Sequence, residues 1–315
     1  RDIMRKILLA STALVAFGTV AANAADVTIS GATDWHYFTY DNDSNTGAVN
    51  GSYVDFDSDV DFKFTTTTDS GLSLTFATGL SETGSDDNNL TIAGDFGSLK
   101  LIGNGEGLAD SAMDESVADN MSTLAPGLGM HGADLNANTV IYTLPSMSGL
   151  TVKAHYQDAG VSTKGDNTAI LLEYSADVAN GSVKAQYITS TTDDTGADGD
   201  QTGTDSDSMG LRVTMDDFQV TASSHTQSDN ANSYDYTNNV IDVKYSGIEG
   251  VTISAFSLSG DDDLNNSYDF TQSAASLTYT IASGLTASVT MTDSEVTDAS
   301  GTVTSDDSTA LNLKA

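Results

Sequence analysis

The sequence contains few positively charged side chains and no cysteine. Of its 315 residues, 45 are Asp or Glu and only 11 are Lys or Arg, so the formal net charge is −34. This charge disfavours a nucleic-acid partner, because the chain would repel phosphate at long range. The lack of cysteine removes thiolate metal ligands and is compatible with any compartment. So acidic a composition would suit a disordered chain, but the regular alternation described below argues against disorder.

Long apolar segments are also missing, apart from one near the N-terminus. Two basic residues follow Met4 in the stretch 4–6 (MRK), and residues 7–17 form an apolar segment. Residues 22–24 (ANA) have the small-x-small form of a cleavage site. The apolar segment is too short to span a membrane as a helix. This arrangement predicts a secretory signal peptide over residues 1–24, with Met4 as the initiator, and therefore an exported protein.

The chain is rich in segments where apolar and polar side chains alternate. Between Tyr53 and Gly71, one parity is apolar and the other is charged. The apolar set is Val54, Phe56, Val60, Phe62 and Phe64, and the charged set is Asp55, Asp57, Asp59, Asp61 and Lys63. A period of two is typical of a β-strand, whose successive side chains point to opposite faces. Because four carboxylates cannot lie unpartnered in a packed core, we expect lipid on one face and water on the other.

This alternation recurs along the chain, and the joints between the segments are sorted by length. The predicted strands are 26–40, 53–68, 72–82, 87–94, 97–104, 138–144, 150–158, 166–177, 181–191, 206–216, 217–226, 237–247, 251–260, 269–282, 285–293 and 307–315. Every second joint is a tight turn, and the joints between them are longer and rich in Asp, Asn, Ser, Thr and Gly. Such sorting is typical of outer-membrane barrels, which have short periplasmic turns and long extracellular loops. We therefore predict an all-β transmembrane antiparallel barrel of about sixteen strands.

Aromatic side chains on the lipid parity are expected at the two membrane interfaces, where such rings concentrate. Trp35 and Tyr37 fall near the outer end of their strand. Tyr142, Tyr174 and Tyr245 fall towards the periplasmic ends of theirs.

Three stretches carry a resemblance to a known family: ADVTISG (25–31), FGSLKLIGNGEG (96–107) and TVIYTLPSMSGLTVKAHYQ (139–157). With the strand pattern over residues 25–315, they resemble the trimeric sixteen-stranded general porins of Gram-negative bacteria, especially the alphaproteobacterial type. The resemblance implies passive diffusion of small hydrophilic solutes and ions through the outer membrane. It also implies a third loop folded into the barrel, contact with membrane lipid, and insertion by the barrel-assembly machinery. Family members usually end in an aromatic residue, whereas this sequence ends at Ala315.

The resemblance further implies a homotrimer whose interface is formed by the first five strands and the last. Small residues expected on the outward faces of these strands are Gly31, Ser58 and Ala93.

Charged side chains are predicted to line the pore. The third loop, residues 103–137, has no basic residue, and the resemblance places its acidic residues at the constriction: Glu106, Asp110, Asp114, Glu115 and Asp119. Basic residues on the lumen parity are Lys63, Lys100, Lys153, Lys184, Arg212, Lys244 and Lys314, alongside the acidic row Asp55, Asp57, Asp59 and Asp61. Opposed acidic and basic rows would set up a transverse field. Alternatively, the lysines neutralise wall carboxylates, and the third loop is a solvated surface loop. The excess of carboxylates predicts a cation-preferring channel.

No cofactor or confident metal site is expected. The four histidines, His36, His131, His155 and His225, lie on separate segments without metal-ligand spacing. The acidic stretches at 41–43 and 193–207 offer oxygen ligands for Ca²⁺ or Mg²⁺, but they match no calcium-binding repeat, and a solvated loop is the simpler interpretation.

Two other functions remain open. An outer-membrane barrel enzyme of the lipase or protease type would need a nucleophile paired with a histidine at the barrel rim, and the sequence has neither a GxSxG motif nor paired histidines. An acidic surface adhesin or structural protein would be expected to show a fixed sequence period, which is absent. A channel without catalytic activity is therefore the favoured interpretation.

Overall fold

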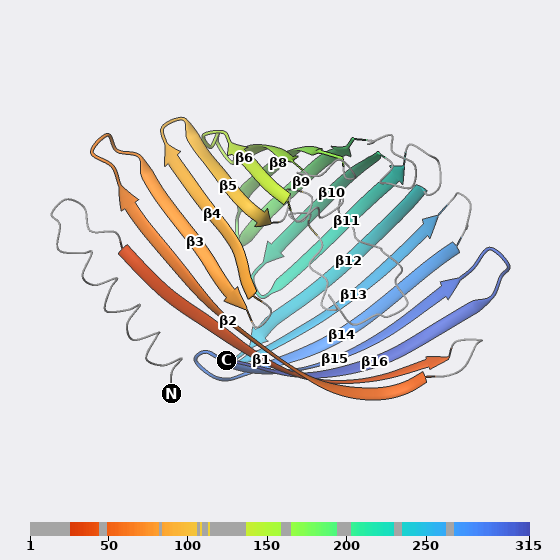
Figure 1. Cartoon of the computed structure of the whole chain (residues 1–315). Helices are drawn as coiled ribbons and strands as arrows, with labels where there is room; N and C mark the ends of the chain where they lie inside the picture. The colour runs from red at the N-terminus through yellow and green to blue at the C-terminus, as the bar shows by residue number, and fades with distance from the viewer. Residues whose placement is uncertain are drawn as a thin grey trace.

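The computed structural model describes residues 26–43, 49–81, 84–105, 108, 113, 137–158, 165–193, 203–229, 235–262 and 268–315. These residues form one closed antiparallel barrel in which each strand pairs with its neighbours in sequence and β1 pairs with β16 (Figure 1). The strands are β1 (Asp26–Asp43), β2 (Val49–Thr67), β3 (Ser73–Ser81), β4 (Gly84–Gly94), β5 (Gly97–Gly105), β6 (Ala137–Thr143), β7 (Leu150–Asp158), β8 (Asn167–Val178), β9 (Gly181–Thr192), β10 (Thr204–Met215), β11 (Phe218–Asp229), β12 (Asp235–Ile248), β13 (Val251–Asp262), β14 (Tyr268–Ala282), β15 (Leu285–Thr297) and β16 (Val303–Lys314). Within the same residues, no helix is long and apolar enough to cross a membrane.

The pairing register separates the two faces of the barrel wall. Directly opposite residues in an antiparallel pair share a face, and Trp35 lies opposite Phe56, whereas Asp34 lies opposite Asp57. The predicted apolar parity is the outward one: large apolar side chains such as Val54 and Leu211 are exposed on the barrel surface. A slip of one residue would move the carboxylates to the lipid face, so the hydrophobic pattern determines the register.

All sixteen predicted strands are confirmed, but several are longer than expected and their connections shorter. The last long loop was expected at 294–306 and spans only 298–302. Its shape depends on Asp298, whose Oδ1 accepts hydrogen bonds from the backbone N–H of Ser300 (2.9 Å) and of Thr302 (2.8 Å). Hydrogen bonds from Ser300 and Thr302 hold the pKa of the Asp298 carboxyl below its ordinary value. The strand ends beside this loop are polar on both faces, so apolar alternation does not mark them.

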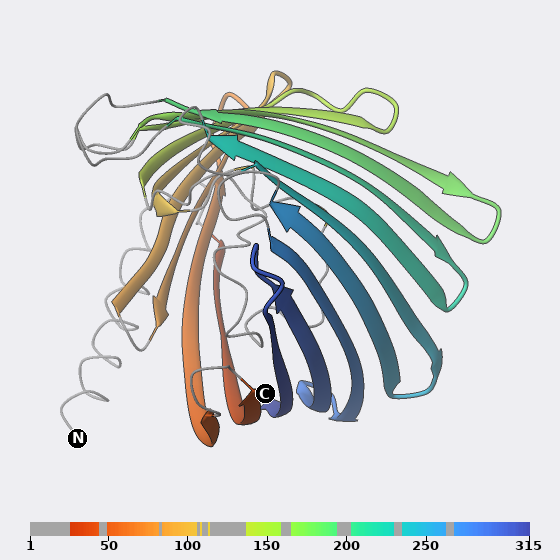
Figure 2. The same ribbon diagram turned by 90° about the vertical axis from the view of Figure 1, so that its right-hand side faces the viewer.

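The wall is uneven in height. Strands β3, β5 and β6 have 9, 9 and 7 residues, whereas β2 and β14 have 19 and 15. Figures 1 and 2 show the short strands together on one side of the barrel and β11 to β16 on another. On β2, only residues 60–67 pair with strand β3. Over residues 49–59, β2 therefore has β1 as its only strand neighbour in the described part of the chain.

Apolar packing lies against the inner face in two places. One cluster consists of Val240, Phe256, Leu258, Phe270 and Ala274 on β12 to β14. The other consists of Leu108 from the third loop with Ala169, Leu171 and Ile188 on β8 and β9. The inner wall is therefore only partly hydrophilic.

Two turn glycines have positive φ but different surroundings. Gly97 has φ +101° at the tight turn between β4 and β5, and a Cβ there would overlap the backbone carbonyl oxygen of Thr143. Gly284 has φ +78° in the turn between β14 and β15, with open space where a Cβ would lie. Both positions suit glycine conformationally, but only Gly97 also needs the absence of a side chain.

We expect Gly284→Ala to lower the free energy of unfolding by about 1–2 kcal/mol, the usual cost of a left-handed backbone for an L residue. Gly97→Ala should cost clearly more, because the β5–β6 pairing must also shift. Urea unfolding of protein refolded into lipid vesicles measures both values. Equal losses for the two variants would contradict the close approach at Gly97.

Candidate functional site

The inner wall formed by β1, β2 and β16 carries a row of carboxylates. Asp55, Asp57, Asp59 and Asp61 occupy alternate positions of β2, so neighbouring members are about 7 Å apart along the strand. All four are exposed, and the side chain of Asp57 keeps 59% of its surface accessible. This row is the predicted acidic pore wall, and the register places it on the inner face.

Two neighbouring strands supply partners for this wall. Lys314 Nζ on β16 lies 2.7 Å from Asp34 Oδ2 on β1. His36 on β1 contacts both neighbouring strands. Its Nδ1 is 2.9 Å from Asn312 Oδ1 on β16, and its Nε2 is 3.6 Å from Asp57 Oδ2 on β2. The carboxylate row is therefore linked to β16 through side chains as well as through the backbone.

The predicted basic residues lie on inward positions of the register, but they differ in their partners. Lys184 Nζ lies 3.1 Å from Glu173 Oε2, and Arg212 Nε donates to Thr221 Oγ1 at 3.1 Å. Together with the Lys314–Asp34 pair, the Lys184 pair fits the expectation that wall lysines neutralise wall carboxylates. In the part of the chain that the structure describes, no ion pair is formed by the others: Lys63, Lys100, Lys153 and Lys244.

Two residues of the third loop lie against the inner wall. Leu108 is 1% exposed and packs with Leu171 and Ile188, and its backbone N–H points to His155 Nδ1 at 3.5 Å. Met113 is 3% exposed, and its Cβ would be 2.6 Å from a Cβ built on Gly210, an inward position of β10. The wall of β7 to β10 therefore receives these two side chains on its lumen side.

The predicted constriction residues, Glu106, Asp110, Asp114, Glu115 and Asp119, lie outside the described residues. Their placement stays a prediction.

Rings on the inner face were not anticipated from the sequence as part of the pore. Phe38 on β1 stacks on Tyr53 on β2, with ring centroids 4.7 Å apart, and both share the face of Asp55. The sequence did contain a signal for this position: Tyr53 has the same parity as Asp55, two residues before the first aspartate of the row. It was missed because aromatic residues in strands were sought only on the lipid side.

The predicted interface aromatics occupy outward positions. Tyr37 lies opposite Val54, and Tyr174 lies opposite Leu150 and Ala185. Trp35 is also outward, opposite Phe56. Tyr142 donates its hydroxyl to the Phe96 carbonyl at 2.7 Å, beside the β4–β5 turn, and Tyr245 packs its ring 4.6 Å from that of Phe218, beside the β10–β11 turn. Rings with a polar contact at a strand end are suited to a membrane interface.

One expected interface residue is on the other face. Gly31 and Ser58 are outward, opposite Val60 and Thr33. Ala93 lies opposite Ser98 and Ser73, on the face of Lys100, so the expectation that it points outward is wrong. Ala93 shares the parity of Thr91, whereas Leu90 and Ile92 form the apolar parity, so the alternation itself favours an inward Ala93.

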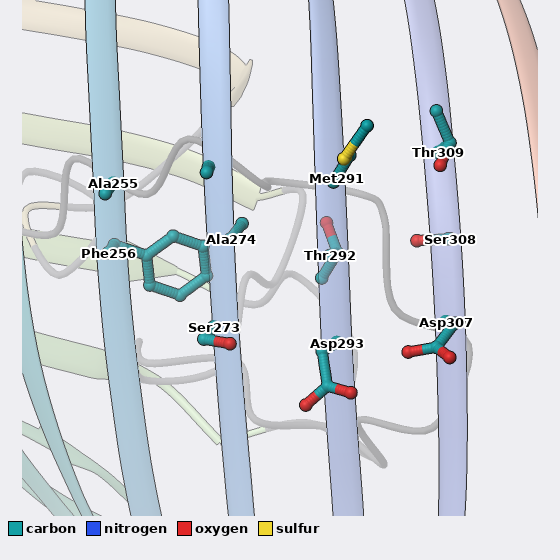
Figure 3. A pocket seen from close by; sticks show the side chains of 11 residues that line it. Ala255, Phe256, Ser273, Ala274, Met291, Thr292, Asp293, Asp307, Ser308 and Thr309 are labelled. Atoms are coloured by element: carbon teal, nitrogen blue, oxygen red, sulfur yellow. The ribbon is translucent and has the colours of Figure 1, made fainter.

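A hollow of about 560 Å³ lies over β13 to β16, and Figure 3 shows the side chains around it. Most of these side chains are outward ones, including Met291, Asp293, Asp307 and Thr309. Asp293 and Asp307 lie directly opposite each other in the β15–β16 register, and their carboxyl groups point towards one another (Figure 3). The hollow is thus on the outer surface and does not belong to the channel.

No three potential metal-ligating side chains come together among the described residues. The side chains at 41–43 and most of the stretch 193–207 belong to the part that is not described, so the Ca²⁺ or Mg²⁺ alternative stays a prediction.

Known proteins match this chain in family and fold. A family model of Gram-negative porins matches residues 10–304, whereas no curated protein matches the sequence. Among solved structures, the anion-selective porin of Comamonas acidovorans is 12% identical, with a TM-score of 0.61 over 92% of this chain and 99% of that one. The trimer form of the outer-membrane protein OmpT of Vibrio cholerae is 14% identical, with a TM-score of 0.62 over 92% and 99%.

A porin mutant of Rh. blastica is 15% identical, with a TM-score of 0.51 over 90% of this chain and all of that one. At such identities the solved structures establish the barrel fold, and the family match extends over most of the chain. The lumen wall with its accessible carboxylates supplies the aqueous face that such a barrel needs. The chain belongs to the Gram-negative porins, and it forms an outer-membrane channel through which solutes diffuse.

Proposed function

We propose that this channel is passive and prefers cations. The observation that carries the proposal is the accessible carboxylate row Asp55 to Asp61 on the inner face of β2. A lumen that presents one sign of charge raises the local concentration of the opposite ion. Along β1, β2 and β16, the inward carboxylates outnumber the inward lysines. One of these lysines, Lys314, forms an ion pair with Asp34.

The resemblance in fold does not determine the sign of the selectivity. The Comamonas acidovorans structure is named as an anion-selective porin, and it shares the barrel at 12% identity. Selectivity must therefore depend on the side chains that line each lumen. In this chain the described wall opposite Leu108 and Met113 is acidic.

We also propose that the third loop narrows the lumen. Leu108 and Met113 lie on the wall of β8 to β10, which faces β1 and β2 across a sixteen-strand barrel. Acidic residues between and beside these anchors, Asp110 and Asp114 among them, would then face the carboxylates of β2. Such a passage would be flanked by negative charge on two sides.

The functional unit we propose is a homotrimer. The uneven wall supports this, because residues 49–59 of β2 have no strand partner on one edge within the described chain, and an uncovered edge near lipid must be paired or covered. A second copy packed on the short wall would cover it. The similar Vibrio cholerae protein is described in a trimer form.

Three further expectations accompany this proposal. The outward apolar belt would contact membrane lipid, and the barrel-assembly machinery would insert the chain after residues 1–24 are removed. Transport itself would need no catalytic step, which distinguishes a porin from a barrel enzyme of the lipase or protease type.

Neutralising part of the carboxylate row should reduce the cation preference. We expect Asp57→Asn with Asp59→Asn to lower the cation-to-anion permeability ratio by roughly two- to fivefold. A change of up to about 1 kcal/mol in the free energy of a permeating ion in the lumen corresponds to this factor. Reversal potentials in a KCl gradient across a planar bilayer measure the ratio. The difference should shrink in 1 M salt, where the screening length falls to about 3 Å.

The matched control is Asp205→Asn with Asp207→Asn, a pair spaced identically on β10 but outward-facing. This pair should change the ratio much less. An anion-selective wild-type channel, or equal effects of the two pairs, would contradict the proposal.

Weakening the Leu108 anchor should disturb the current through the open channel. Leu108→Ala removes a buried side chain whose loss typically costs about 2–5 kcal/mol of packing. We expect a changed single-channel conductance and more open-channel noise. The outward variant Leu211→Ala should leave both unchanged, and a wild-type current in Leu108→Ala would show that this anchor does not control the lumen.

A bulky outward residue on the short wall should weaken the trimer. Ser58→Trp would place an indole on the proposed interface, whereas Ala222→Trp would place one on the outward face of β11, far from it. We expect crosslinked trimers in native membranes for the wild type and for Ala222→Trp, with fewer for Ser58→Trp. Monomers alone in the wild type would rule out the trimer.

A further inference from the structure

Three ring side chains form a continuous row on the inner wall, at the end of β1 and β2 that leads to the connection 44–48. Phe38 lies directly opposite Tyr53, with ring planes inclined by 21°. His36 is two residues from Phe38 on the same face of β1, and its ring stacks on Phe38 with centroids 5.6 Å apart and planes 14° apart. The three rings therefore present nearly parallel faces along the wall.

The row remains accessible although it lies on the side of the channel water. Tyr53 keeps 49% of its surface exposed. The phenyl rings on the inner wall at Phe256 and Phe270 are instead buried, at 4% and 1% exposure. Exposed apolar surface in water is unfavourable, so a solute with a flat apolar body gains free energy by covering the exposed ring of Tyr53.

The row also ends at negative charge. Asp55 follows Tyr53 on the inward face of β2, and His36 connects the row to Asp57 through the 3.6 Å contact of its Nε2. Inward side chains on one strand are about 7 Å apart. A solute whose ring stacks on Tyr53 can therefore place an ammonium group beside Asp55 through a short linker. Asp57 is the next inward carboxylate along β2.

We propose that His36, Phe38 and Tyr53, with Asp55 and Asp57, form a transient binding site for organic cations that carry an aromatic ring. The ring of the solute stacks on the exposed ring of Tyr53, whose other face is covered by Phe38, and its ammonium group is attracted by the carboxylates and by the ring faces. A ringless cation uses only the carboxylates, and an aromatic anion is repelled by them. The site rests on the proposed function, because these residues must line the conducting path.

The site predicts a selective block of the potassium current by 2-phenylethylammonium. In planar bilayers containing the mature full-length protein, this cation should reach half-block at a concentration roughly two- to fivefold lower than ethylammonium, as expected for an exposed cation–aromatic contact. Phenylacetate should not block. Tyr53→Leu and Phe38→Leu keep an apolar side chain but remove the ring, and each should bring the ratio of half-block concentrations close to one.

The control is Tyr174→Leu, which removes a ring of similar exposure from the outward face and should keep the wild-type ratio. Equal block of the wild type by the two ammonium ions would overturn the site, and this comparison needs no variant to fold. A ratio retained in both Tyr53→Leu and Phe38→Leu would overturn it as well. Reversal potentials in the same membranes test the cation preference separately: an anion-selective wild type refutes the proposed function, whereas equal block in a cation-selective channel refutes only this site.

Discussion

The structure depends on one requirement: every backbone N–H and C=O inside the hydrocarbon must have a hydrogen-bond partner. A sheet meets this requirement only when it closes on itself. Closure is completed at the chain end, where the N–H of Ala315 donates to the Thr33 carbonyl and the N–H of Thr33 donates to the Ala315 carbonyl, each at 2.8 Å. Once the sheet is closed, it has two faces and no edge in the membrane, except where, among the described residues, the short strand β3 leaves residues 49–59 of β2 without a strand partner on one side.

Closure then determines where charge can lie. Because side chains alternate, each strand places half of its residues against lipid, and charged residues there would cost about 2–4 kcal/mol each near the midplane for basic side chains and less for acidic ones. The aspartates of β2 and the lysines paired with Asp34 and Glu173 are all inward. The inward position of these charges is therefore a consequence of the fold, and it makes a strongly acidic composition compatible with a membrane protein.

The pattern of β2 shows how much of this follows from sequence. Val54 and Asp55 differ in parity, and parity alone predicts the strand, its two faces and the direction of each side chain. The number of strands follows from repetition of that pattern, whereas the family follows from the resemblance of residues 25–31, 96–107 and 139–157 to known porins. Strand ends did not follow, because polar residues on both parities, as around Asp298, carry no alternation. Ala93 was placed on the wrong face although its parity partners Asn89 and Thr91 are polar, so in this case the alternation was informative and was not followed.

Long-range contacts are the other part that sequence could not supply. Nothing local in the third loop indicates that Leu108 packs on Ile188, since this contact joins residues 80 positions apart and depends on barrel closure. The Phe38–Tyr53 stack is different. Its two strands are consecutive and its parity was known, so the contact was predictable as soon as the register of β1 on β2 was assigned.

The two kinds of side chain on that face act over different distances. Carboxylates influence ions across roughly 8 Å at physiological salt, so the Asp55 to Asp61 row affects any ion that passes this side of the lumen. Ring faces act only in contact, within about 6 Å of a ring centroid, so the Phe38–Tyr53 pair affects only solutes that touch the wall. Added salt weakens the first effect and leaves the second nearly intact, because screening acts on charge and not on apolar contact. The proposed preference for positive charge should therefore depend on salt, whereas the proposed preference for flat apolar solutes should not, and each is assigned to a separate set of inward side chains on the same two strands.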